Sequence, residues 1–338
     1  MMDVAAMAGV SQATVSLVLN GSPGVKLAQS TRDRVFASAA DLGYQFVPRR
    51  ARRSQITRST IIFVADEVST DPWIPLAFEG ASDRALDFGV TTALLVSHGD
   101  DEVEALLAPL LDQQAVLGYI YGTALTRLVE PAPSLKQKQS VLINCYDQDG
   151  ALPGLVPSDV AGGRLATERL LEAGRCRIGL INGQQGVDNS RNRLRGYKQA
   201  LAAADVSFDA ALVRYGNWEP SSGYEMTHQL MQLPNPPDAI FCANDMMAMG
   251  CIDALRERGS SVPDDVAVIG YDDREIAQFT HPPLTTLILP FYDMGQLAAD
   301  MLLGEAPIPE LGSPPTQVDC ALVERGSVRA QAPVSATR

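Results

Sequence analysis

Acidic and amide side chains follow three apolar stretches of this chain, where strands of a parallel sheet would end: Asp66 and Asp71, Asn244 and Asp245, and Asp272 and Asp273. Arg193 begins a helical stretch, and Trp218 lies in a loop. Carboxylates, amides and guanidinium groups hydrogen-bond hydroxyls, and an indole ring packs against the apolar face of a sugar. Together the set indicates a site for a small polyhydroxylated ligand, although any one of these residues alone could be a helix cap or a surface ion pair.

Catalytic chemistry finds little support in the sequence. The three histidines (His98, His228 and His281) are scattered, and there is no GxSxG, Walker A or GxGxxG motif. The five cysteines include no CxxC pair. We therefore expect no catalytic residue, no metal site and no cofactor.

From Ser59 onward, apolar strands alternate with amphipathic helices in two series. Strands are expected at STIIFVAD, TTALLVS, GYIYG and SVLINCY, and again at RIGLIN, DAIFCAND and VAVIGYDD. Helices are expected near 76–87, within LLAPLLD, and along VAGGRLATERLLEAG, RNRLRGYKQALAAA, GYEMTHQLMQL and MAMGCIDALRERG. This order predicts an α/β body of two doubly wound parallel-sheet subdomains, which bind ligands beyond the carboxyl ends of their strands.

Three short helices precede this body. A helix capped by Asp3 runs through Ala8, Gly9 makes a corner, and a second helix follows to Asn20. A third is expected from about residue 31 to 42, with Gly43 ending it. The inward-facing residues would be Val4, Ala5, Ala8, Val15, Val18, Leu19, Val35, Ala39 and Leu42. The pattern fits a helix-turn-helix unit or an ordinary three-helix bundle.

In a helix-turn-helix unit the second helix enters the DNA major groove, and its groove-facing residues would be Ser11, Gln12, Ala13, Thr14, Ser16 and Leu17. Charge favours this reading. Residues 1–58 contain eight Lys/Arg and three Asp/Glu, whereas the remaining 280 residues contain 19 and 37. A basic front on an acidic body indicates a polyanionic partner for the front alone.

Length and composition limit the class of protein. A chain of 338 residues suits two or three domains, and 46% apolar residues allow a substantial core. No apolar run is long enough to span a membrane, and the N-terminus lacks a signal-peptide pattern. The cysteine pattern suggests reduced thiols. We expect a cytoplasmic protein, associated with the nucleoid when bound to DNA.

Several motifs match one family in order and spacing. DVAAMAGVSQATVSLVLNG, TRDRVFASAADLGY, CANDMMAMG and VIGYDDREIAQFTHPPLTTL closely resemble segments of the lactose-repressor-like (LacI/GalR) transcription factors, and the resemblance extends to about residue 325. It implies a sequence-specific regulator, expected to be a repressor, that binds a near-palindromic operator as a homodimer. Leu17 stands where the family often has Arg, and 26–30 is about two residues longer than usual.

The resemblance also implies a hinge that becomes helical on DNA and inserts a Leu into the minor groove. Here Arg53 occupies the usual Leu position. Either Ile56 is the wedge in a shifted register, or arginines fill a narrow groove; without DNA a solvated linker is expected. The expected DNA contacts beyond the second helix are Asn20, Tyr44, Arg49, Arg50, Arg52, Arg53 and Ile56.

Effector contacts carried over from the family by matching position are Arg193, Trp218, Asn244, Asp272 and Phe291, with Asp71 and Trp73 in the first strand–helix loop and Tyr121 on the opposite wall. The family has Asp just ahead of its xAGG segment. Here Ser158 occupies that position and Asp159 is next to it, so either could face the cleft.

The expected organisation is a head (1–46), a hinge linker (47–58), a body (59–330) and a disordered tail (331–338). Within the body, the N-subdomain would comprise about 59–156 plus 288–318, and the C-subdomain about 157–287 plus 319–330. The expected effector is a sugar. The sequence is compatible with an effector that releases the protein from DNA and with one that strengthens DNA binding. The alternative is a sugar-binding transport protein, but the basic head stands where such a protein would carry a signal peptide. An enzyme acting on the cleft ligand is the third reading.

Overall fold

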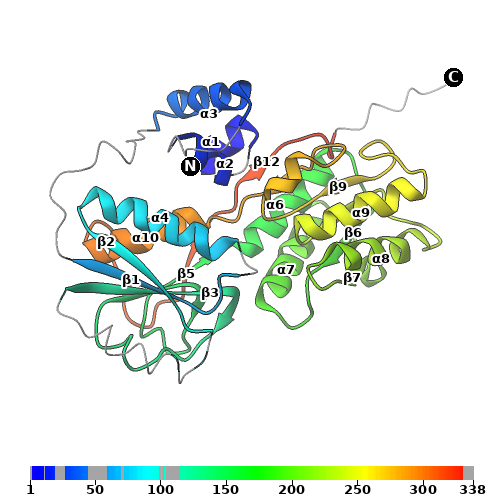
Figure 1. Ribbon diagram of the computed structural model, residues 1–338. Helices are drawn as coiled ribbons and strands as arrows, with labels where there is room; N and C mark the ends of the chain where they lie inside the picture. Colours follow the sequence, from blue (N-terminus) through cyan, green and yellow to red (C-terminus); the bar gives the residue numbers. More distant parts are fainter. Residues whose placement is uncertain are drawn as a thin grey trace.

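The computed structural model describes residues 2–10, 12–19, 27–44, 59–69, 72–98, 100, 103 and 115–329. Figure 1 shows a small helical head beside a body of two lobes. The structure therefore has the expected class: a short helical head followed by an α/β body with parallel sheets.

The head consists of α1 (Met2–Ala8), α2 (Gln12–Leu19) and α3 (Gln29–Asp41). The expected inward residues of all three helices are buried, with one exception. Leu42 is 42% exposed, so its assignment to the core was wrong. The helix ends at Asp41, and Gly43 (φ +63°) turns the chain so that the amide of Tyr44 donates to Ala39. Leu42 thus lies beyond the last turn that faces the core.

The first lobe is built on a six-stranded parallel sheet in the order β11-β5-β4-β3-β1-β2. Its strands are β1 (Thr60–Ala65), β2 (Thr91–Val96), β3 (Val116–Leu128), β4 (Ser140–Tyr146), β5 (Gly154–Pro157) and β11 (Thr316–Val318). Helices α4 (Trp73–Asp87) and α10 (Phe291–Leu303) pack against each other over this sheet. The central strands are almost entirely buried because both faces of the sheet are covered.

The second lobe has a four-stranded parallel sheet in the order β7-β6-β8-β9. Its strands are β6 (Ile178–Asn182), β7 (Val213–Tyr215), β8 (Ala239–Cys242) and β9 (Ala267–Ile269). They alternate with α6 (Asp159–Glu172), α7 (Asp188–Ala203), α8 (Pro220–Met231) and α9 (Asp245–Glu257), and with the 3-10 helices η2 (Ala210–Leu212) and η3 (Glu275–Gln278). Asn244 and Asp245 follow the carboxyl end of β8, and Asp272 and Asp273 follow that of β9.

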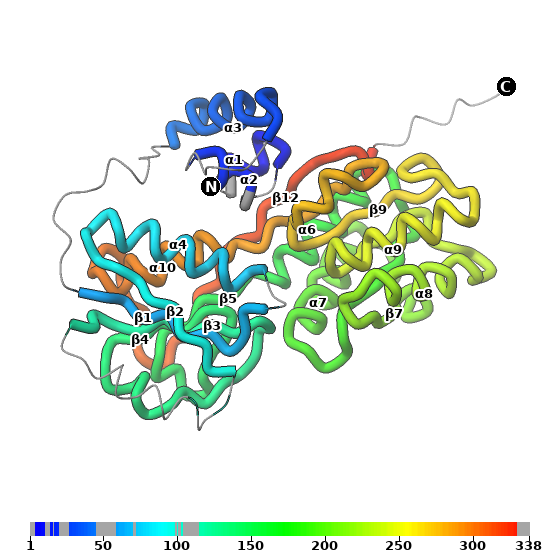
Figure 2. The backbone as a smooth tube through the Cα atoms, viewed as in Figure 1, coloured from blue at the N-terminus to red at the C-terminus, as the bar shows by residue number. Residues whose placement is uncertain are grey.

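Three segments connect the lobes. One runs from β5 into α6, a second passes through β10 (Thr286–Leu287) to α10, and a third leads from β11 to β12 (Leu322–Val323). β10 and β12 form a small antiparallel ladder. In Figure 2 the head lies beside this connection, where α1 contacts β12.

Helices α6 and α7 approach each other closely through two glycines. A Cβ atom at Gly163 would lie 2.4 Å from the carbonyl oxygen of Arg193, and one at Gly196 would lie 2.1 Å from that of Val160. Only glycine permits this backbone contact. The contact fixes α7, and with it the Arg193 side chain, against the start of α6.

Candidate functional site

A cavity of about 490 Å³ lies between the lobes. It is lined by residues of both: Glu67, Pro72, Trp73, Ala124, Leu125, Asn144, Asn189, Arg193, Trp218, Glu219, Asn244, Met246, Asp272, Arg274, Leu289 and Phe291. Five residues carried over from the family, namely Arg193, Trp218, Asn244, Asp272 and Phe291, thus come together on one cavity, and Trp73 joins them.

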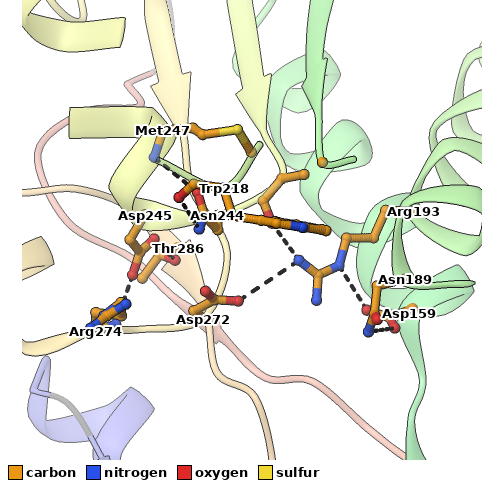
Figure 3. A network of polar contacts seen from close by, with 12 residues as sticks. Asp159, Asn189, Arg193, Trp218, Asn244, Asp245, Met247, Asp272, Arg274 and Thr286 are labelled. Atoms are coloured by element: carbon orange, nitrogen blue, oxygen red, sulfur yellow. Dashed lines mark hydrogen bonds and ion pairs between the residues drawn. The ribbon is translucent and has the colours of Figure 1, made fainter. Parts of the chain in front are cut away.

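Arg193 is the central cation of the cavity. Its Nε donates to Asp159 Oδ1 at 2.7 Å, its Nη1 donates to the carbonyl of Ala243 and lies 3.7 Å from Asp272 Oδ1, and its side chain is almost fully buried. The guanidinium stacks on Tyr271, 3.7 Å from the ring centroid. Figure 3 shows it between Asp159 and Asp272, below the ring of Trp218. Although burial alone would lower the Arg193 pKa, the carboxylates raise it, so the charge persists.

Asp159 and Asn189 extend this network to the other lobe. Asn189 donates to Asp159 Oδ2 at 2.8 Å and to Thr126 Oγ1 at 2.9 Å, and it accepts from the Thr126 amide. Thr126 belongs to β3 and donates through Oγ1 to Asn144 Oδ1. A hydrogen-bonded chain therefore runs from Arg193 across the cleft to the first lobe.

Trp218 and Asn244 form the wall opposite this chain. Asn244 caps α9, with its Oδ1 accepting from the Met247 amide at 2.8 Å, while its Nδ2 donates to the carbonyl of Trp218 at 2.9 Å. Trp218 has φ +73°, and its ring lies over Gly183, where any Cβ atom would collide with it. The indole is thus packed closely against Gly183, and Trp218 lines the cavity.

Asp272 and Asp273 follow β9 in unusual backbone conformations, with φ of +110° and +54°. Burial raises the pKa of Asp272 well above its usual value, and Arg193 opposes that shift. Burial likewise raises the pKa of Asp273 to about 6, although Arg325 Nη2 lies 2.7 Å from its Oδ1. Strained backbone of this kind is found where side chains must be held toward a site.

Trp73 and Phe291 close the first-lobe side of the cavity. Trp73 begins α4 and Phe291 begins α10, and their ring centroids are 6.1 Å apart. The cavity therefore combines an Arg–Asp pair, amides and aromatic plates, which are the groups that recognise the hydroxyls and apolar faces of a sugar.

Some predicted cleft residues lie elsewhere. Tyr121 is 6% exposed and belongs to a buried cluster with Ile62, Val64 and Leu142, so its placement on the cleft wall was wrong. The period-two alternation of β3 puts it on the same face as Tyr119. Ser158 is buried ahead of α6, where its Oγ donates to Gln317 Oε1. Asp159, not Ser158, reaches the network. Asp71 lies outside the described residues.

The sequence reading missed Asn144 and Asn189. Asn189 lies four residues before Arg193, and hence on the same face of α7, which was a usable signal. Asn144 lies within the strand expected at SVLINCY and has φ +59°. A strand pattern does not reveal such a local turn.

In the head, Thr14 is 3% exposed, so its assignment to the exposed groove-facing set was wrong. It lies one turn before the core residue Val18 and shares its face of α2. Leu17 and Tyr44 are partly exposed. The side chains of Ser11, Gln12, Ala13, Ser16 and Asn20, and the hinge residues Arg49, Arg50, Arg52, Arg53 and Ile56, lie outside what the structure describes, as does the tail.

Within the described part of the chain, no His, Cys, Asp or Glu residues form a group that could hold a metal ion. No helix there is long and apolar enough to cross a membrane.

Family models match both parts of the chain. The model for bacterial regulatory proteins of the lacI family matches residues 1–46, and that for a periplasmic binding protein-like domain matches residues 167–328. The repressor CytR of Escherichia coli K12 is 31% identical, with 98% of this chain and 96% of CytR covered. The ribose operon repressor of the same strain is 32% identical, with 97% and 99% covered.

Two solved structures are also similar over nearly the whole chain. The transcriptional regulator CelR in complex with cellobiose is 30% identical, with a TM-score of 0.64 and coverage of 96% of this chain and 98% of that one. The lac repressor dimer bound to operator and the anti-inducer ONPF is 28% identical, with a TM-score of 0.65 and coverage of 97% and 98%. This chain therefore belongs to the lacI family of bacterial regulatory proteins, and it is a DNA-binding transcriptional regulator rather than an enzyme.

Proposed function

We propose that this protein is a repressor whose affinity for its operator is controlled by a sugar bound between the two lobes. The observation that carries this proposal is the Arg193 network, in which a buried guanidinium held by Asp159 lines one cavity together with Asp272 and three aromatic residues. The relatives support it: CytR and the ribose operon repressor are named repressors, and the CelR structure holds cellobiose.

We further propose a division of labour along the chain. Residues 1–46 read the operator, with Leu17 and the neighbouring groove-facing residues making base contacts. Residues 47–58 form the hinge, and residues 59–330 bind effector and dimerise. A head this small covers only a few base pairs, so a twofold dimer on a near-palindromic site gives useful specificity. The lac repressor structure, a dimer on operator, is consistent with that arrangement.

Effector control requires a sugar to bind two states of the protein differently. Closure of the lobes around the cavity is the conformational difference that this fold makes available, because three segments connect the lobes. A coupling of about 1–3 kcal/mol would change operator affinity roughly 5- to 150-fold.

The test uses the full chain in a buffer that resembles the cytoplasm, where we expect the protein to act. Genomic fragments retained by the protein supply an operator, and fluorescence anisotropy then follows its release as sugars are added. D-ribose, D-glucose, D-xylose and cellobiose are suitable first probes, with calorimetry for direct binding. We expect at least one to bind the cavity and shift operator affinity; operator binding with no response to any sugar would remove sugar control and leave the DNA-binding role intact.

A further inference from the structure

A second cavity of about 500 Å³ adjoins the one containing Arg193. Its walls outside the shared residues come from α4, from α9, from η3 and from the segments after β9 and β10; four of these six residues are apolar, and the other two are Asp273 and Glu275. The apolar side chains that line it are Trp73, Leu76, Met246, Met249, Ile276, Ile288 and Leu289. The first cavity, by contrast, is lined by many more groups that hydrogen-bond or carry charge.

The two cavities adjoin each other and differ in the chemistry of their walls. Six residues line both: Pro72, Trp73, Met246, Asp272, Arg274 and Leu289. Each volume lies within the roughly 300–1,000 Å³ typical of small-molecule sites. A single sugar ring beside Arg193 would leave the apolar compartment filled only with water.

The charges of the polar compartment favour an uncharged ligand. Among the described residues that line it, besides Asp272, whose pKa burial raises, Glu67 and Glu219 are acidic, and Arg274 is the cation besides Arg193. Arg193 is already paired with Asp159, which lies 2.7 Å from its Nε. A phosphate group would therefore meet surplus negative charge in a partly desolvated space.

We propose that the effector is an uncharged glycoside, with its sugar ring beside Arg193 and an apolar aglycone in the second compartment. The inference rests on the sugar-binding role proposed above and narrows it to an amphipathic ligand. Trp73 and Leu289 lie at the junction of the compartments, where they contact the apolar side of the glycosidic linkage. Burial of the aglycone against methionine, leucine and isoleucine side chains supplies the additional affinity.

Calorimetry on the full chain tests this with matched pairs: methyl and phenyl glycosides of D-glucose, D-galactose and D-mannose, in both anomers. We expect at least one phenyl glycoside to bind tenfold or more tightly than its methyl counterpart, because the phenyl ring removes more apolar surface from water. Equal affinities within every pair that binds would overturn the proposal. The 6-phosphate of the preferred sugar is expected to bind at least tenfold more weakly than that sugar; equal or tighter binding also overturns it.

A substitution in the second cavity tests whether the higher affinity for the phenyl glycoside arises there. Met249 lines the second cavity and not the first, so Met249→Gln should lower the phenyl-over-methyl preference severalfold and leave methyl glycoside binding unchanged. Met226→Gln is the matched control, because Met226 is also half-buried but lies on α8, away from both cavities. Ile276→Asn, at an exposed position, provides a second variant if the first unfolds. An unchanged preference in a folded variant would place the phenyl ring elsewhere and refute the proposal.

The pairs also separate this proposal from the one it rests on. If methyl glycosides bind and phenyl glycosides bind no more tightly, the ligand does not occupy the apolar compartment, but the proposed sugar-binding role is retained. If no member of any pair binds while operator binding persists, both proposals fail.

Discussion

At the scale of single residues, the arrangement of the cavity depends on Arg193. It is held by Asp159, by the Ala243 carbonyl and by the ring of Tyr271, so its position is fixed before any ligand arrives. A group positioned in this way binds hydroxyls without a further loss of conformational entropy.

Arg193→Ala should abolish the effector response. Removing the cation leaves Asp159 and Asp272 buried without their partner, so we also expect a loss of about 3–5 kcal/mol of stability. Operator affinity, measured by anisotropy below the melting temperature, should stay within a few fold, because Arg193 lies in the body. Arg195→Ala, exposed on the same helix, is the control. Unchanged effector affinity by calorimetry would remove Arg193 from the site.

The buried carboxyl group of Asp245 should make the stability of the protein depend measurably on pH. It is fully buried, accepting from Thr286 Oγ1 and from the Arg274 amide, and burial raises its pKa from 3.8 to about 7. Between about pH 4 and pH 7 the folded state keeps a proton that the unfolded state releases. This group therefore makes the protein less stable as the pH rises through that window, by at most about 4 kcal/mol.

Asp245→Asn should remove that contribution. The stability of this variant relative to the parent should rise between pH 4.5 and pH 7, as measured by denaturant unfolding. Asp253→Asn, exposed on the same helix, should show no such trend. A stability difference that stays constant across this range would show that Asp245 is ionised in the folded protein.

Leu17 is expected to influence which operator is chosen. A groove-facing leucine can pack on a thymine methyl but cannot make the two hydrogen bonds that arginine makes to guanine. Leu17→Arg should therefore change the preferred sequence, since one such contact is worth about 1–3 kcal/mol of discrimination. Selection from a random DNA pool, beside a melting curve of each protein, checks this. The same preferred sequence with a less stable head would mean that Leu17 packs inward.

Single residues were predictable where a motif or a strand end identified them. Arg193, Trp218, Asn244 and Asp272 came from matched segments, and all four line the cavity. Asn144 and Tyr121 illustrate the limit. Which of two strand residues faces a cavity depends on local register and on φ, and neither is encoded by residue type.

At the scale of elements, β3 differs most from its sequence pattern. The apolar run GYIYG predicts a short strand, but β3 continues to Leu128. Between Gly122 and Arg127 its register against β4 shifts, and the extra residues include Ala124 and Leu125 of the cavity wall. Hydrogen bonds from Thr123 and Thr126 to Asn144 hold this extension, and a strand pattern does not reveal such contacts.

The start of α4 shows a similar effect. The sequence predicts a helix from about residue 76, and the structure begins it at Trp73. Pro75 lies in the first turn, where its missing amide costs nothing. The earlier start brings Trp73 to the cavity.

The contact between α6 and α7 gives a prediction for an element. Gly196→Ala places a methyl group 2.1 Å from the Val160 carbonyl, so α7 must move outward. We expect a net loss of about 1–3 kcal/mol, despite the gain in helix propensity, together with weaker effector binding as Arg193 shifts. Urea unfolding and calorimetry measure the two effects. Gln199→Ala, exposed on α7, is the control, and an equally stable Gly196→Ala protein would contradict the packing described here.

At the scale of the whole molecule, the uneven distribution of charge governs association with DNA. The first 58 residues are basic, and the rest of the chain is strongly acidic. The acidic body is repelled by DNA, so binding should be confined to the head and hinge.

We expect a dimer whose operator affinity falls steeply with salt. Arg49, Arg50, Arg52 and Arg53 from two protomers displace counterions, and each phosphate contact makes the slope of log affinity against log salt about 0.9 more negative. Anisotropy between 50 and 200 mM salt, at concentrations where sedimentation gives the dimer mass, tests this. No preference for any genomic site over random DNA at about 150 mM salt would refute sequence-specific binding.

The interleaved course of the chain through the two lobes also sets an order of events during synthesis. The four strands of the second sheet lie between residues 178 and 269, so that sheet can form as soon as this segment leaves the ribosome. The first sheet, although it begins at residue 60, lacks its edge strand β11 and its covering helix α10 until residue 318 has emerged. Since domains fold as units when their elements become available, the second lobe should be complete while the first still exposes apolar strands. During most of translation, the first lobe is therefore the part of the protein that exposes apolar strands to which a chaperone can bind.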